Sequence, residues 1–150
     1  MIARIAVFQA TQADVDDLTP LYSAYRSFFH GHADLADSRP FLQARLSADE
    51  AVVFLARADG HAAGFTLLYP MWSSWHCKRI WFLSDLYVAE KFRKLGAGQR
   101  LIERVKEYAR ETDASSVMVE LPHSEAHLEA FYDRLGFHKD AIFDLARYHP

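Results

Sequence analysis

The sequence has little cysteine and no long hydrophobic run. Cys77 is the single cysteine among 150 residues, which excludes an intramolecular disulfide and a cysteine-rich zinc site and suits a reducing compartment. No apolar run approaches the roughly 20 residues that span a bilayer. The first ten residues, MIARIAVFQA, also lack the apolar core and cleavage signal of a secretory peptide. These absences predict a soluble, cytoplasmic protein that does not bind membranes.

Positive charge is not in excess either. The 17 lysines and arginines are outnumbered by 20 aspartates and glutamates, and the formal net charge is −3, so no overall basic field attracts nucleic acid. Proline and glycine are scattered rather than gathered into a linker. Hydrophobic residues make up 51% of the sequence, enough for a sizeable core. We therefore expect one domain over residues 1–150.

Hydrophobic periodicity predicts both strands and helices. A helix capped by Thr11, with Asp14 three residues on, follows the first strand, and Gly136 stands where a C-terminal helix cap is expected. The strands come first in a run and later alternate with helices. This order predicts an α/β (α+β) fold, with a mixed central sheet flanked by helices on both faces. The expected strands are 2–9, 51–58, 62–71, 79–88, 115–122 and 141–148, and the later helices are 40–47, 98–113 and 124–136.

The stretch FRKLGAG, residues 92–98, lies between a predicted buried strand and an amphipathic helix. The first amides of a helix have no partner within the helix and carry partial positive charge. Glycines at such a place let a phosphate approach the main chain, so the stretch predicts a pyrophosphate site. The alternative is that Gly96 and Gly98 only form a tight turn.

Two other phosphate motifs fit this stretch poorly. GAGQRL begins like a dinucleotide fingerprint, and Glu120 ends the next strand at about the distance of a ribose-binding acid. Leu101, however, stands where that fingerprint needs a small residue. A Walker A loop is excluded because the Lys-Ser/Thr pair is missing.

The longer stretch LYVAEKFRKLGAGQRLIERV closely resembles the acetyl-CoA loop of the GNAT superfamily of N-acetyltransferases, in which Arg/Gln-x-x-Gly-x-Gly/Ala follows a strand. Arg93, Gly96 and Gly98 occupy those positions, and EAFYDRLGF resembles the second signature of the superfamily. The resemblance implies the GNAT fold, acetyl-CoA as co-substrate and a small-molecule amine as acceptor. Within the superfamily, YPMWSSWHCKRIWFLSDLYV looks most like the spermidine/spermine acetyltransferase branch. That likeness favours a polyamine or amino-acid-like acceptor, and a homodimer.

The resemblance also implies roles for individual residues. Tyr132 matches the tyrosine that protonates the leaving thiolate, although its helical spacing also fits a core position. The family's glutamate, a candidate relay for the amine proton, is Ser84 here, and a hydroxyl is too weakly basic for that role. Asp85 is the other candidate, but strict alternation would place it on the face opposite Ser84, and it could equally be a structural carboxylate. The cofactor-binding residues implied are Leu86, Tyr87, Val88, Arg93, Lys94, Leu95, Gly96, Ala97, Gly98 and Gln99.

For the acceptor, aromatic side chains could wall a groove and acidic side chains could attract an amine. We assign these roles to Tyr25, Trp75, Asp34 and Asp37, with core packing and a solvated loop as the alternatives. His123 and His127 lack a third ligand, so no metal is expected. The rival function is a non-catalytic acyl-CoA-binding regulatory domain, because the family's glutamate is replaced.

Overall fold

The computed structural model describes residues 2–31 and 35–150. The chain divides into two compact units, Met1–Glu120 and Leu121–Pro150. That the whole chain forms one domain stays a prediction.

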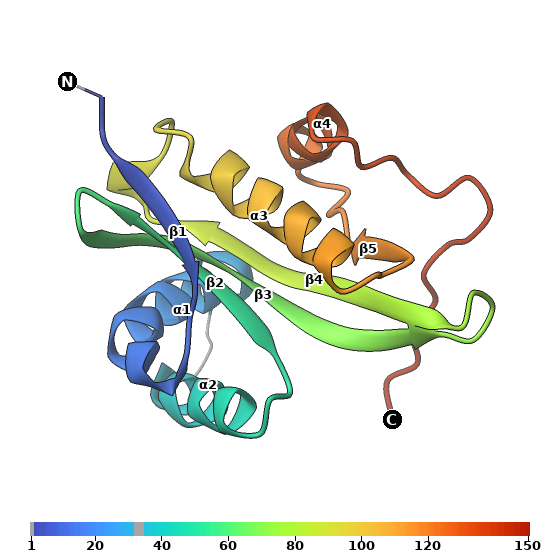
Figure 1. Ribbon diagram of the computed structural model, residues 1–150, viewed down its shortest axis with the longest axis horizontal. Coiled ribbons are helices and arrows are strands. Elements are labelled where there is room, and N and C mark those ends of the chain that lie inside the picture. Colours follow the sequence, from blue (N-terminus) through green and yellow to red (C-terminus); the bar gives the residue numbers. More distant parts are fainter. Residues whose placement is uncertain (1, 32–34) are drawn as a thin grey trace. The chain divides into compact units, whose positions relative to one another are not determined.

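The first unit is built on a five-stranded sheet (Figure 1). Its first four strands are antiparallel and the fifth is parallel to the fourth, so the predicted mixed sheet is confirmed. Asp59 and Gly60, at φ 49° and 84°, form the tight turn between the second and third strands, because this turn requires two left-handed residues. The strands lie in the order β1 (Ile5–Gln9), β2 (Val52–Ala58), β3 (His61–Ser73), β4 (Lys78–Val88) and β5 (Ser116–Val119).

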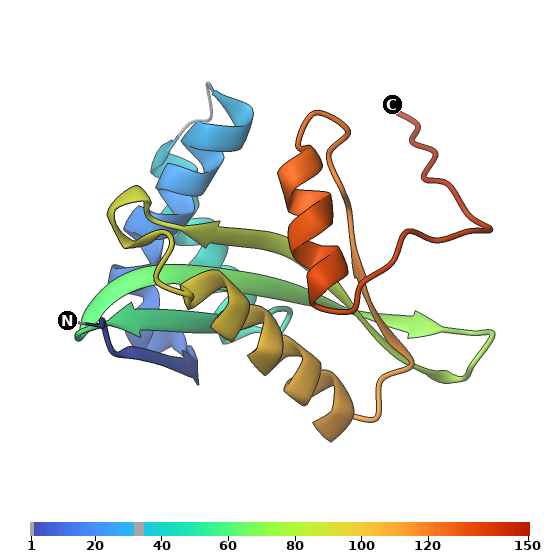
Figure 2. The ribbon, with the colours of Figure 1, turned by 90° about the horizontal axis from the view of Figure 1, so that it is seen from above.

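Helices cover both faces of this sheet, as the sequence predicts. α1 (Val15–His30) and α2 (Ser38–Ser47) lie on one face, and α3 (Ala97–Glu111) lies on the other (Figures 1 and 2). Two neighbouring residues of β2 contact the helices on opposite faces of the sheet. Leu55 joins a buried cluster with Leu18 of α1, whereas the ring of Phe54 lies 5.5 Å from that of Tyr108 in α3. Short 3-10 helices connect the elements: η1 (Gln12–Asp14), η2 (Leu35–Asp37) and η3 (Glu90–Phe92).

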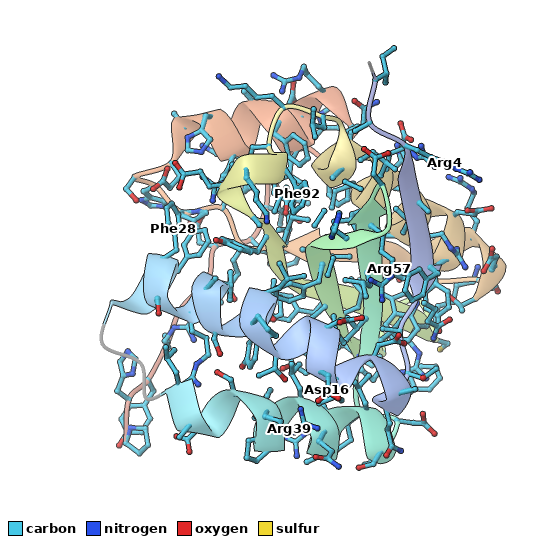
Figure 3. All side chains as sticks on the ribbon, turned by 90° about the vertical axis from the view of Figure 1, so that its left-hand side faces the viewer. Arg4, Asp16, Phe28, Arg39, Arg57 and Phe92 are labelled. Atoms are coloured by element: carbon cyan, nitrogen blue, oxygen red, sulfur yellow. The ribbon has the colours of Figure 1, made fainter. Side chains whose placement is uncertain are left out.

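A capping box marks the start of α1, and an exposed ion pair joins α1 to α2. The Thr11 side chain accepts a hydrogen bond from Ala13 N, and Thr11 N donates to the Asp14 carboxylate at 2.8 Å, which completes a capping box around η1 directly before α1. Further along, Asp16 of α1 faces and pairs with Arg39 of α2 (Figure 3). The predicted cap at Thr11 is thus confirmed.

A β-bulge interrupts β4 at Ser84. Leu83 pairs with Leu68 of β3 and Asp85 pairs with Leu67, so Ser84 is an extra residue without a partner in β3. The bulge changes which way the following side chains face. The ring of Trp81 lies 5.1 Å from that of Tyr108 in α3, whereas that of Tyr87 lies 6.3 Å from that of Tyr25 in α1.

Strict alternation would have put Trp81 and Tyr87 on the same face of the sheet. The expectation that alternation sets the face of Asp85 relative to Ser84 is therefore wrong, because the alternation breaks there. Asp85 stands two residues before Tyr87 on the regular part of the strand, and it shares the face that α1 and α2 cover.

The second unit contains helix α4 (Ala126–Arg134). Gly136, at φ 91°, ends it: Gly136 N donates to Asp133 O and Phe137 N donates to Tyr132 O, both at 3.0 Å. These two bonds make a Schellman motif, and the rings of Tyr132 and Phe137, 5.4 Å apart, supply its hydrophobic contact. The predicted terminating role of Gly136 is confirmed.

The strand predicted at residues 141–148 is wrong. Residues 137–150 form no helix or strand, and the Asp140 carboxylate accepts hydrogen bonds from the amides of Ile142 and Phe143 at 2.8 and 2.9 Å. These bonds compete with a strand ladder for the same amides. The apolar side chains that suggested the strand are mostly exposed: Ile142 at 82%, Phe143 at 74%, Leu145 at 69% and Tyr148 at 85%.

In the part of the chain that the structure describes, no helix is both long enough and apolar enough to cross a bilayer.

Candidate active site

The edge of β4 that faces β5 is only partly paired. The pairing with β5 runs from Ile80 to Leu83 and stops there, while β4 continues to Val88. Among the described residues no strand covers the β5 side of the stretch from Ser84 to Val88. An extended ligand could pair with the backbone groups that point to this side, as an added strand would. Leu86, Tyr87 and Val88 lie on this stretch, as predicted.

On the opposite side, the backbone of β3 lies very close to the end of β4. Gly64 pairs with Val88, and a Cβ placed on Gly64 would lie 2.7 Å from Tyr87 O and 3.1 Å from a methyl group of Val88. A larger residue at position 64 would therefore push the end of β4 away from β3. Glycine here has a packing function that the sequence alone does not indicate.

The loop after β4 turns sharply into α3. Lys94 has φ 64° and Gly96 has φ 88°, and neighbouring amides in such turns often converge on an anion. Gly96 is the N-cap of α3, and no side chain caps the helix or places an acidic group in its first turn. A Cβ on Gly96 would meet nothing within 4 Å. The amides from Gly96 to Gln99 are thus open to a phosphate group.

Arg93 holds this loop against the end of β4. Its Nε donates to Val88 O at 2.9 Å, and its guanidinium carbon lies 5.5 Å from the ring of Phe28 and 5.6 Å from that of Tyr87. Phe28 stands at the end of α1 (Figure 3). Arg93 therefore has a positioning function that the motif does not reveal. Lys94 and Leu95 are exposed beside it, and Ala97 is buried.

Asp85 affects two tyrosines on the face that α1 and α2 cover. Burial and then the charge of Asp85 raise the pKa of Tyr69 to about 12. Burial and then Asp85 also raise the pKa of Tyr22, while Arg26 lowers it. The hydroxyl of Thr66, itself fully buried, donates to the backbone carbonyl of Asp85 at 2.9 Å. Asp85 thus stands next to the bulge at Ser84 and within electrostatic reach of Tyr22.

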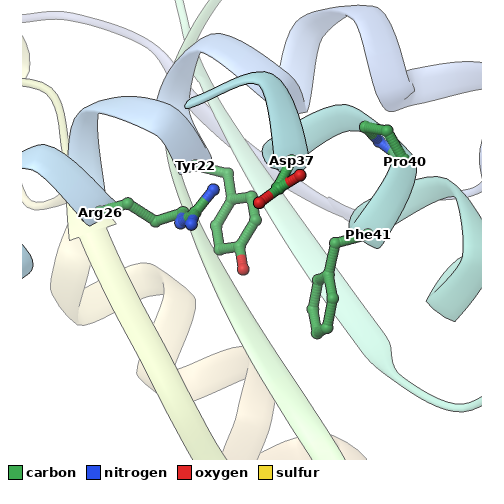
Figure 4. A pocket seen from close by; sticks show the side chains of 5 residues that line it. All are labelled: Tyr22, Arg26, Asp37, Pro40 and Phe41. Carbon is green, nitrogen blue, oxygen red and sulfur yellow. The ribbon is translucent and has the colours of Figure 1, made fainter. Parts of the chain in front are cut away.

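Tyr22 also lines an open pocket between α1 and α2, with a volume of about 550 Å³ (Figure 4). Volumes of this size suit small ligands. The sequence prediction included Asp37 but not Arg26, Pro40 and Phe41. Arg26 could have been found, because it stands four residues after Tyr22 and therefore on the same face of the helix. The residues that line the pocket are Tyr22, Arg26, Asp37, Pro40 and Phe41.

The structure does not bring the other predicted acceptor residues to this pocket. Tyr25 packs its ring 6.0 Å from Phe65 and 6.3 Å from Tyr87, against the sheet. Trp75, 89% exposed, lies in the β3–β4 turn, and roughly 33 Å of strand separates the start of β4 from its end at Val88. A contact of Trp75 with the acceptor stays a prediction. Asp34 lies outside the described residues.

In the second unit Tyr132 is buried, and its ring lies 5.2 Å from that of Phe131. Its function as an acid stays a prediction. His127 pairs with Glu125 through Nδ1 at 3.3 Å. Within residues 2–31 and 35–150, no group of three or more His, Cys, Asp or Glu residues could hold a metal ion.

Comparison with known proteins agrees with this arrangement. The acetyltransferase (GNAT) family matches residues 15–137. YhfO of Bacillus subtilis (strain 168), an uncharacterized N-acetyltransferase, is 36% identical over 135 residues, which cover 90% of this chain and 91% of YhfO. A crystal structure of a probable acetyltransferase is also 36% identical, with a TM-score of 0.89, and covers 97% of this chain and 98% of its own.

A structure that contains CoA shares the fold. The aminoglycoside N-acetyltransferase AAC(6')-Iy in complex with CoA is 22% identical, with a TM-score of 0.74 over 100% of this chain and 98% of its own.

Sheet, loop and relatives together define an acyltransferase of the N-acetyltransferase type. The chain belongs to the acetyltransferase (GNAT) family, whose members use acetyl-CoA.

Proposed function

We propose that this protein transfers the acetyl group of acetyl-CoA to the primary amine of a small molecule, with a polyamine or an amino-acid-like amine favoured. One observation carries the proposal: a strand edge that β5 does not cover, Ser84–Val88, is followed through a short loop by a helix start whose amides no side chain caps. An extended chain that ends in a pyrophosphate, as in CoA, matches both parts of this surface.

The residues of the loop and the strand edge would hold the co-substrate. The amides from Gly96 to Gln99 bind the pyrophosphate, and the backbone of Leu86, Tyr87 and Val88 pairs with the extended arm. Acetyl-CoA supplies an activated acyl group. Arg93 keeps the loop and the strand end together through its bond to Val88 O.

Two side chains are proposed to move protons. The Asp85 carboxylate takes the proton that the amine must lose, because Asp85 stands at the bulge and electrostatically close to the pocket residue Tyr22. Ser84, next to it, is too weakly basic for this function and is proposed only to hold the bulge. The Tyr132 hydroxyl donates a proton to the leaving thiolate, which departs as the thiol, since a neutral phenol can serve as the acid without bringing a charge into apolar surroundings.

The experiment is an assay of CoA release from acetyl-CoA with a panel of polyamines, amino acids and simple amines. Turnover with at least one amine is expected. CoA binding without turnover on any amine would favour the non-catalytic regulatory domain instead, a rival that remains because Ser84 replaces the family's glutamate.

A further inference from the structure

Two aromatic rings in the pocket between α1 and α2 each lie near an arginine. The rings of Tyr22 and Phe41 are stacked, with centroids 6.0 Å apart. The guanidinium carbon of Arg26 lies 5.8 Å from the Tyr22 ring, and that of Arg45 lies 4.7 Å from the Phe41 ring. Among the five residues that line the pocket, Arg26 is the one cation and Asp37 the one acid; Arg45 is outside this lining and pairs with Glu50 at 3.4 Å.

Arg26 is held in a defined orientation. Its Nη1 donates to the hydroxyl of Ser38 at 3.0 Å, and Ser38 is fully buried. In Figure 4 the Arg26 guanidinium and the Asp37 carboxylate lie on either side of the Tyr22 ring. A guanidinium fixed in this way is prepared to pair with a carboxylate, because little side-chain freedom remains to be lost on binding.

The charges of the pocket separate the two acceptor classes. A polyamine carries only positive groups and would place one of them beside Arg26, where like charges repel. An amino acid carries one carboxylate and one amine. The carboxylate matches Arg26, and the amine matches the acidic residues, Asp37 at the rim and Asp85 beyond Tyr22.

We propose that the acceptor is an amino-acid-like molecule, whose carboxylate pairs with Arg26 while its apolar part packs against Tyr22 and Phe41. This inference rests on the proposed acetyl transfer and selects between its two acceptor classes. Arg26 is then the residue that determines specificity, and it takes no part in moving protons.

The test compares three probes with the full-length protein and acetyl-CoA: phenylalanine, phenylalaninamide and spermidine. The amide keeps the ring and the amine but lacks the carboxylate, and its less basic amine is the more easily deprotonated. A higher kcat/KM for the acid therefore cannot arise from the amine itself. We expect the acid to exceed both the amide and spermidine by about tenfold or more.

Arg26→Gln should remove this preference by raising KM for the acid about tenfold or more, with little change in kcat and little change for the amide. Arg39→Gln is the matched control, since Arg39 is an exposed arginine of α2 that pairs with Asp16 outside the pocket. The control should keep the preference of the parent protein.

Each result decides between the two proposals. Equal or faster reaction of the amide or of spermidine would overturn the amino-acid acceptor and leave acetyl transfer intact. The same holds if Arg26→Gln lowers kcat/KM equally for all three probes. No CoA release with any amine would overturn acetyl transfer itself. The comparison of probes on the parent protein decides the question even if Arg26→Gln does not fold.

Discussion

A substitution at Tyr132 can separate a catalytic function from a packing function, because the hydroxyl would serve catalysis and the ring serves packing. The ring packs against Phe137 within the Schellman motif that ends α4. Tyr132→Phe keeps that contact and deletes the hydroxyl. We expect turnover to fall about 10²-fold while CoA binding persists, the usual scale for a positioned acid. Steady-state kinetics and CoA titration measure the two effects.

The control for this prediction is Tyr108→Phe in α3, where the ring lies between Phe54 and Trp81. It also deletes a phenol and should leave turnover unchanged. The pH profile gives a second criterion, because loss of the acid removes the descending alkaline limb. Unchanged turnover and an unchanged profile in Tyr132→Phe would make Tyr132 a core residue.

The raised pKa of Tyr69 predicts how the free energy of unfolding changes at alkaline pH. Burial, and next the charge of Asp85, raise the pKa of its phenol from 10.0 to about 12. The folded protein therefore holds this proton between pH of about 10 and 12, where the unfolded chain releases it. The resulting stabilisation is present below about pH 10 and is lost as the pH rises to about 12.

Tyr69→Phe removes this titration, so its free energy of unfolding should fall less over the same pH interval than that of the parent protein. Urea unfolding at a series of alkaline pH values measures the difference. Parallel curves for the two proteins would show that the Tyr69 phenol titrates alike in the folded and unfolded states.

At the scale of elements, the loop and the start of α3 act as one anion site. Gly98 lies in the first turn of that helix, and side chains there would occupy the space proposed for the pyrophosphate. Gly98→Ala and Gly98→Val should weaken CoA binding in that order, by about tenfold or more for valine. Isothermal titration with CoA checks this, with circular dichroism as the control for folding. If a folded Gly98→Val variant bound CoA with the affinity of the parent protein, the loop would be only a tight turn and not an anion site.

Local patterns could be predicted from the sequence, whereas features set by a partner element could not. The strands β2, β3 and β4, the cap at Thr11 and the glycine at position 136 follow from periodicity and backbone preferences. The bulge at Ser84 depends on the register with β3, which no residue of β4 reveals. The pocket depends on Phe41 and Arg26 meeting across two helices. Residues 141–148 have the composition of a strand, but a strand also needs a neighbour to pair with.

At the scale of the molecule, the exposed tail bears on assembly. Ile142, Phe143 and Leu145 leave most of their surface uncovered, and clustered apolar side chains of this kind often mark an interface. Together with the family resemblance, they support the predicted homodimer. We expect a mass of twice 17.2 kDa from light scattering, and a monomer for Phe143→Asp with Leu145→Asp. A monomeric parent protein would contradict this prediction.

The bulge at Ser84 accommodates one more residue in β4 than the pairing with β3 needs, while Asp85 and Tyr87 stay on the face of the sheet that α1 covers. It does so through the number of residues in β4, whatever side chain stands at position 84. Ser84→Ala keeps the count and should change the free energy of unfolding by less than about 1 kcal/mol. Deletion of Ser84 removes the bulge but leaves Leu83 opposite Leu68 and Asp85 opposite Leu67, so that Asp85 and Tyr87 keep the face that α1 covers. Deletion of Leu86 makes Asp85 and Tyr87 neighbours, so that one of the two must turn toward α3; we expect this deletion, unlike that of Ser84, to cost about 3 kcal/mol or more in urea unfolding and to abolish acetyl transfer. In chains that share this fold, the loss of one residue beyond the bulge would therefore be more damaging than a change in composition or the loss of the bulge itself.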